Sequence, residues 1–120
     1  MKNMFYQPLN QESLRRINNI VTGFKKHPLY DAYYIRSYCY DARECVHAIE
    51  VGKGAQPINL WLFYPGRNGE INSIAVYGSY LQGHLNAIRN SMTVFGMPVE
   101  SVDMDCSGMS DFVDIYLKEY

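Results

Sequence analysis

A run of apolar residues near the middle of the chain constrains the fold more than any other feature. Residues 60–64 are continuously apolar, which predicts a central strand over residues 58–64 that is buried on both faces. The next segment, 65–70, contains Asn68-Gly69, a dipeptide that tolerates the positive φ angles of tight hairpins. Residues 71–77 then return as a partner strand. The centre of the chain therefore predicts an antiparallel hairpin.

Tyrosines concentrate in residues 30–40, which hold five of the 11 tyrosines of the chain. Aromatic and β-branched residues dominate this segment, and such residues predict a strand. Alternation along a strand divides the segment between two faces. The face expected to line the core carries Tyr33, Ile35, Ser37 and Cys39. The opposite face carries Tyr34, Arg36, Tyr38 and Tyr40.

Residues 44–51 fit two structures. Asp41 with Glu44 resembles a helix capping box, and the apolar residues that follow fit one helix face. The same segment also alternates through Cys45, His47 and Ile49, and the glycine-rich residues 52–54 would end a strand equally well. We assign a strand that pairs with the preceding one, and the helix stays an alternative.

Helical spacing predicts three helices around these strands. The first covers residues 11–26, with Asn10 as its N-cap and Pro28 beyond its end. The second is a long helix at about 79–95, terminated by Gly96. The third is a short C-terminal helix capped by Ser110. Its apolar face would be Phe112, Val113, Tyr116 and Leu117.

The predicted fold class is α+β, because the strands are grouped together and flanked by helices. We expect an antiparallel three- to four-stranded sheet, flanked by the N-terminal helix, the long helix at about 79–95 and the short C-terminal helix. A length of 120 residues predicts a single compact domain over residues 1–120.

The bulk properties of the chain exclude several classes of protein. A formal net charge of −1 lacks the basic excess of a dedicated nucleic-acid binder, so no nucleic-acid partner is expected. No apolar run approaches the roughly 20 residues that span a bilayer, so no membrane contact is expected. Three cysteines argue against a secreted disulfide scaffold, and the first residues lack the apolar stretch of a signal peptide. We therefore expect a cytoplasmic protein.

The tyrosine-bearing strand gives the strongest candidate site. Tyrosine and arginine are enriched at interface hot spots, because they combine a large contact area with a polar tip. We predict that Tyr34, Arg36, Tyr38 and Tyr40 contact a protein partner, and that the acidic residues after Pro98 steer its approach. The alternatives are that this face packs under a helix or that it stacks nucleic-acid bases.

Two rival hypotheses involve chemistry. A thiol enzyme would pair Cys39, Cys45 or Cys106 with His27, His47 or His84, although nothing in the sequence brings any pair together. A calcium loop is suggested by residues 103–114, where Gly108 stands at loop position 6 and oxygen-bearing side chains at positions 1, 3, 5, 9 and 12. Those side chains belong to Asp103, Asp105, Ser107, Asp111 and Asp114. Ordinary capping of the C-terminal helix explains much of the same pattern.

These patterns contain no complete catalytic constellation. We therefore predict a small cytoplasmic protein-binding module that acts by surface complementarity without catalysis: an inhibitor, an immunity-type protein or an adaptor. The alternatives are a small hydrolase or nuclease-like enzyme using a Cys/His pair, and a calcium-responsive module using residues 103–114. A homodimer could use the same tyrosine-bearing face. No cofactor is expected apart from the calcium of that alternative.

Overall fold

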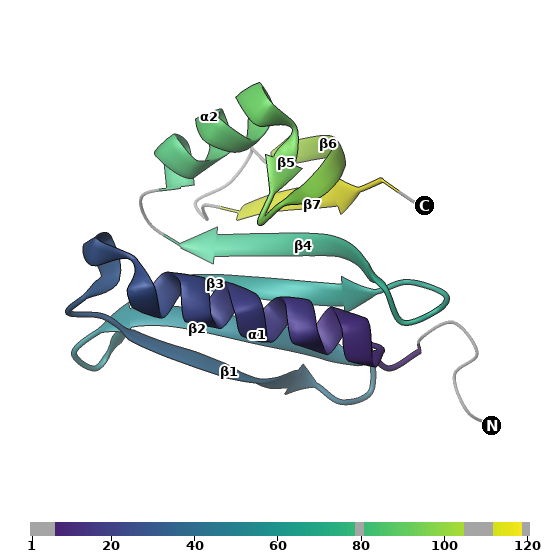
Figure 1. The fold of residues 1–120 in the computed structure, drawn as a ribbon, viewed down its shortest axis with the longest axis horizontal. Helices are drawn as coiled ribbons and strands as arrows, with labels where there is room; N and C mark the ends of the chain where they lie inside the picture. Colours follow the sequence, from purple (N-terminus) through teal and green to yellow (C-terminus); the bar gives the residue numbers. More distant parts are fainter. Residues whose placement is uncertain (1–6, 79–80, 105–111, 119–120) are drawn as a thin grey trace.

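The computed structural model describes residues 7–78, 81–104 and 112–118, and Figure 1 shows their arrangement. Within these residues the chain forms the α-helices α1 (Gln11–Lys26) and α2 (Leu81–Ser91) and the 3-10 helix η1 (Pro28–Tyr30). The strands are β1 (Tyr34–Asp41), β2 (Val46–Lys53), β3 (Gln56–Pro65), β4 (Ile71–Gly78), β5 (Thr93–Val94), β6 (Met97–Met104) and β7 (Phe112–Leu117).

The described strands form a seven-stranded antiparallel sheet in the order β1-β2-β3-β4-β7-β6-β5, which curves into a half-barrel. The α+β class is confirmed. The expected sheet of three to four strands is wrong, because β5, β6 and β7 extend it beyond β4. The expectation of three flanking helices is also wrong, since the described residues contain two α-helices.

The C-terminal segment explains most of that difference. Residues 112–117 form β7, which lies between β4 and β6 instead of forming a helix. Val113, Ile115 and Leu117 are buried, whereas Asp114 is half-buried and Tyr116 is exposed. This alternation is the period of a strand, and the helical interpretation had grouped residues that a strand places on opposite faces.

The second helix is shorter than its apolar pattern suggested. It ends at Ser91 because Met92 has a φ of +51° and residues 93–94 form β5. Phe95 and Gly96 also have positive φ angles and make the two-residue turn from β5 into β6. The apolar stripe that predicted a helix to about residue 95 therefore runs on into a hairpin.

Other expectations are confirmed. The helix over residues 11–26 is α1, and the Asn10 side chain accepts a hydrogen bond of 2.8 Å from the Ser13 N–H as its N-cap. The hairpin predicted from the central apolar run is β3–β4, with a φ of +80° at Gly69. The ambiguous segment 44–51 contributes to β2, which pairs with β1.

The turn between β3 and β4 also anchors the start of α1. The Asn10 N–H and the Ser13 hydroxyl each donate to the Gly69 carbonyl at 2.8 Å. A Cβ atom on Gly69 would lie 2.5 Å from the Pro8 carbonyl oxygen, so this close approach needs glycine. The helix is thereby fixed against the end of the central hairpin.

Both described α-helices lie over the same face of the sheet, the inner face. Ile17, Ile20 and Phe24 of α1 and Ile88 of α2 belong to one apolar cluster with the inward side chains of the strands. Figure 1 shows α1 running along the sheet in front of β2 and β3. The outer face carries a second, smaller cluster made by Val46, Ala48, Leu62 and Ala75.

Within residues 7–78, 81–104 and 112–118, no helix has the length and apolar character needed to cross a bilayer.

Candidate functional site

The structure places the four predicted contact residues on the outer face of β1. β1 is an edge strand of the sheet, and Ile35 of β1, together with Tyr33 directly before the strand, packs against the inner cluster as expected. Ser37 and Cys39, expected in the core, are exposed. The described α-helices cover the inner face, so the interpretation that this side of β1 packs beneath one of them does not hold. The outward residues are Tyr34, Arg36, Tyr38 and Tyr40.

The Glu50 carboxylate on β2 ties three of these residues together. The Tyr34 hydroxyl donates to Glu50 Oε2 at 2.6 Å, and the Tyr38 hydroxyl donates to Oε1 at 2.9 Å. Arg36 Nη1 lies 4.0 Å from Oε2, and its guanidinium carbon lies 5.4 Å from the centre of the Tyr38 ring. The Glu50 side chain is 14% exposed, whereas that of Arg36 is 64% exposed. One shielded acceptor therefore holds the rings in fixed positions.

The titration behaviour of these groups reflects the same contacts. Hydrogen bonds from Tyr34 and Tyr38, together with the Arg36 charge, lower the pKa of Glu50 against the opposing effect of burial. The hydrogen bond to Glu50 raises the pKa of Tyr34, and burial followed by the bond to Glu50 raises that of Tyr38. At neutral pH the carboxylate is charged and both phenols are protonated, which is the state that makes both bonds.

The backbone also makes room for the network. Gly52 stands opposite Tyr34 in the β1–β2 register, and a Cβ atom there would lie 2.2 Å from the Tyr34 ring. A residue with a Cβ atom would therefore force the Tyr34 ring out of its present position. Glycine at position 52 thus positions the first ring of the face.

Three more tyrosines extend this surface across the sheet. Tyr64 of β3, Tyr77 of β4 and Tyr116 of β7 lie on the outer face, where Tyr64 and Tyr116 both stand opposite Ser73 in neighbouring strand pairs. Burial chiefly raises the pKa of the Tyr64 and Tyr77 hydroxyls, and the nearby Tyr40 hydroxyl adds a smaller contribution. We call this surface the tyrosine face, and it comprises Tyr34, Tyr38, Tyr40, Tyr64, Tyr77 and Tyr116.

The tyrosine rings form a thin second layer over the sheet. Tyr38, Tyr64 and Tyr77 pack against the small outer cluster and are half-buried. Tyr40 and Tyr116 are 51% and 41% exposed. Tyrosine suits this position because its ring covers apolar strand residues while its hydroxyl stays in water.

The tyrosine face also carries an acidic pair. Asp103 of β6 and Asp114 of β7 stand directly opposite each other. Burial raises the pKa of Asp114, and the negative charge of Asp103 raises it further. The negative charge of Asp114 in turn adds to the effect of burial, which chiefly raises the pKa of Tyr64 and Tyr77. Like charges directly opposite on a sheet destabilise the free protein, so this pair favours a cation from outside.

The calcium interpretation of residues 103–114 loses part of its support. A calcium loop of this kind is followed by a helix, whereas here the strand β7 follows it. Asp103 and Asp114 lie opposite each other in the paired strands β6 and β7. Asp105, Ser107 and Asp111 lie outside the described residues. Among the residues that are described, no three His, Cys, Asp or Glu side chains gather in a way that could hold a metal ion.

One cysteine and one histidine do come together. Cys39 of β1 stands opposite His47 of β2, and His47 Nε2 is hydrogen bonded to the Ser37 hydroxyl at 2.8 Å. Burial lowers the pKa of His47. Cys45 lies apart in the β1–β2 turn with a φ of +59°, and His27 caps η1. Cys106 and the side chain of His84 lie outside the described part of the chain.

Comparisons of the chain with known protein families, with curated proteins and with solved structures find no significant match. The functional argument therefore rests on the geometry of the tyrosine face.

Proposed function

We propose that the protein is a small protein-binding module that acts without catalysis, as an inhibitor, immunity-type protein or adaptor does, and that it binds through the tyrosine face. The observation that carries this proposal is the Glu50 network, which holds Tyr34, Arg36 and Tyr38 in place on a sheet face that neither of the described α-helices covers. Fixed aromatic rings lose little conformational entropy on binding, so they make effective interface anchors.

The charges on the face favour a basic partner surface. Asp103 and Asp114 repel each other across the β6–β7 pair, and a lysine or arginine between them would relieve that repulsion. Tyr64 and Tyr77 lie on the same outer face of the sheet as Asp114, and the π face of an aromatic ring also attracts a cation. Arg36 already faces Glu50 within the protein, so it does not offset the acidic pair.

The test is affinity capture from cells of the source organism, followed by affinity measurement with the purified partner. We expect capture of a protein with a basic contact surface, and weaker binding by Tyr40→Ala and Arg36→Ala. Hot-spot truncations cost 2 kcal/mol or more, which corresponds to a loss of affinity of about 30-fold. Both side chains are mainly exposed, so these variants keep the fold.

Leu29→Ala supplies the matched control. Leu29 is 74% exposed, but it follows α1 and lies away from the tyrosine face. The control should bind the purified partner as the wild type does. If all three variants retain full affinity, or if Leu29→Ala alone loses it, the tyrosine face is not the binding surface.

A thiol enzyme is the second candidate, favoured by the juxtaposition of Cys39, His47 and Ser37. A histidine that assists Cys39 as a base would accelerate its alkylation by iodoacetamide. We expect His47→Gln to slow that alkylation at pH 7 if this candidate is correct. Equal alkylation rates in the wild type and in His47→Gln would exclude it.

A further inference from the structure

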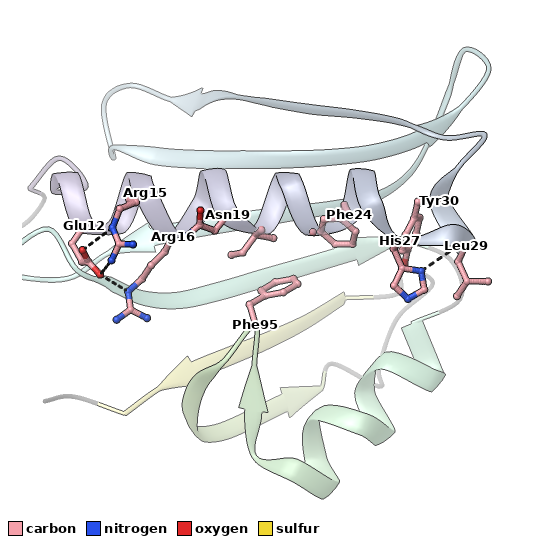
Figure 2. Close-up of a pocket in the computed structure, with 11 residues that line it drawn as sticks. Glu12, Arg15, Arg16, Asn19, Phe24, His27, Leu29, Tyr30 and Phe95 are labelled. Carbon is pink, nitrogen blue, oxygen red and sulfur yellow. Dashed lines mark hydrogen bonds and ion pairs between the residues drawn. The ribbon is translucent and has the colours of Figure 1, made fainter.

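A groove runs along α1 on the helix-covered side of the molecule, away from the tyrosine face. It has a volume of about 670 Å³ and lies between α1, η1 and the turn that joins β5 to β6. Figure 2 shows Phe95 of that turn directed toward α1, with Arg15 and Arg16 at one end of the groove and Leu29 at the other. This volume is within the range of small-molecule binding sites, about 300–1,000 Å³.

One end of the groove is aromatic. Phe24 packs edge-to-face against Tyr30, with the ring centres 5.1 Å apart, and against Phe95 at 5.8 Å. Phe95 packs in turn against Trp61 on the sheet at 4.9 Å. Phe95 is 37% exposed and Leu29 is 74% exposed, so this end offers apolar surface to a ligand.

The position of Phe95 requires an uncommon backbone. Its φ is +51° and that of Gly96 is +79°, which are the angles of a type I′ hairpin turn. Asparagine and aspartate tolerate the first position of such a turn, whereas an aromatic residue there costs about 1 kcal/mol or more. The ring contacts with Phe24 and Trp61 compensate for that cost and fix the wall of the groove.

The other end of the groove is cationic. Arg15 donates to both carboxylate oxygens of Glu12, at 2.5 and 3.1 Å, and Arg16 Nε lies 3.4 Å from Glu12 Oε1. Two guanidinium groups thus share one carboxylate. The cluster keeps a net positive charge, and guanidinium donors remain for an incoming anion.

A glycine inside α1 keeps the groove open. Gly23 lines the groove, and a Cβ atom built on it would meet nothing within 4 Å. Glycine in a helix interior costs about 1 kcal/mol relative to alanine, and here no neighbouring atom demands it. A larger residue at this position would occupy the groove instead of packing into the core.

We propose that this groove binds a small amphipathic carboxylate, with its apolar body between Phe24, Phe95 and Leu29 and its carboxylate on Arg15 and Arg16. The cationic and apolar ends of the groove are separated along α1. Arg16 and Phe24 are eight residues apart on α1, which corresponds to about 12 Å along the helix axis. The groove and the tyrosine face lie on opposite sides of the sheet, so this inference is independent of the proposed function.

The fluorescence of Trp61 can report binding in the groove. It is the one tryptophan in the sequence, and its ring contacts both Phe95 and Phe24 beside the groove. Titration with sodium decanoate should change its fluorescence in a saturable way. Decyltrimethylammonium carries the same chain with the opposite charge and should bind at least tenfold more weakly, because it meets the guanidinium groups.

Matched variants locate the binding. Gly23→Leu should reduce decanoate affinity at least tenfold by filling the groove, whereas Asn18→Leu, on an exposed position of α1 outside the groove, should not. Arg16→Gln should weaken binding about tenfold, since a charge-assisted hydrogen bond is lost. Lys25→Gln removes one positive charge from the same helix outside the groove and should leave the affinity unchanged.

Several results would overturn the proposal. These are no saturable change with decanoate, equal binding of decyltrimethylammonium, and full affinity in Gly23→Leu. Binding to anionic phospholipid vesicles without binding to free decanoate would assign the groove to a membrane surface, and this result would also reject the proposal.

Discussion

Replacement of Glu50 tests how the tyrosine face is held. Glu50→Ala removes the acceptor of the hydrogen bonds from Tyr34 and Tyr38, at 2.6 and 2.9 Å. Hydrogen bonds to a charged group contribute about 1.5–3 kcal/mol each when they are shielded from water. The two tyrosines are half-buried, so their hydroxyls regain water when the acceptor is lost. We therefore expect the free energy of unfolding to fall by about 2 kcal/mol for the pair.

Urea unfolding followed by Trp61 fluorescence measures this loss. A dependence of about 2 kcal/mol per molar urea converts the expected loss into a midpoint lower by about 1 M. Glu44→Ala removes an exposed glutamate from the β1–β2 turn and should change stability by less than about 0.5 kcal/mol. Tyr34→Phe and Tyr38→Phe keep the rings and remove one bond each, so each should account for about half of the effect.

The effect should also depend on pH in a defined direction. The pKa of Glu50 is lowered in the folded protein, chiefly by the hydrogen bond from Tyr34. The stabilisation from ionised Glu50 is therefore complete above the usual glutamate pKa, about 4.3. It is lost as the pH falls through the lowered pKa of the folded state. The stability difference between the wild type and Glu50→Gln should thus shrink below about pH 4. An unchanged midpoint in Glu50→Ala, or a difference that persists undiminished at low pH, refutes this reasoning.

Three further predictions concern other parts of the fold. Asp103→Asn should raise the free energy of unfolding by about 0.2–1 kcal/mol at pH 7, because it removes the repulsion between Asp103 and Asp114, and thermal melts would detect the gain. Burial and then this repulsion raise the pKa of Asp114, so the gain should vanish once Asp114 is protonated in acid. Burial lowers the pKa of His47, so the free energy of unfolding should decrease as the pH falls below the ordinary histidine pKa of about 6.5. His47→Gln should flatten that part of a curve of stability against pH. Gly69→Ala should lower the urea midpoint by the equivalent of about 2 kcal/mol or more, because Gly69 has a φ of +80° and the added Cβ atom would lie 2.5 Å from the Pro8 carbonyl oxygen. A midpoint equal to that of the wild type would contradict this close approach.

Local patterns predicted the order of the elements in the first two thirds of the fold, although they left residues 44–51 open between helix and strand and began the strand at residue 30 instead of Tyr34. Asn10, the apolar run at residues 60–64 and Asn68-Gly69 each specify one local structure, and α1 and the β3–β4 hairpin form as predicted. The segment 112–117 is different, because its six residues fit a helix face and a strand face equally well. Pairing with β4 and β6 decides between the two, and that pairing depends on residues far away in the sequence.

The candidate site was likewise predicted only in part. Alternation within a single strand identified Tyr34, Arg36, Tyr38 and Tyr40 as neighbours, although it gave no indication that Glu50 binds two of them. Tyr64 was missed because the apolar run around it predicted burial on both faces, and Tyr77 was missed because its strand was predicted without an assignment of its faces. Their outward position follows from both α-helices lying on one side of the sheet, and a local pattern does not encode that arrangement.

Site-specific photocrosslinking tests the central claim, that the tyrosine face contacts a protein, most directly. The photoreactive residue p-benzoylphenylalanine would replace Tyr40 or Tyr116 on that face, and Leu29 on the groove side, in otherwise unchanged full-length protein. Irradiation in cells of the source organism should crosslink the same partner from positions 40 and 116 and not from position 29. Crosslinking from position 29 alone, or no crosslink from either tyrosine position, would contradict the account.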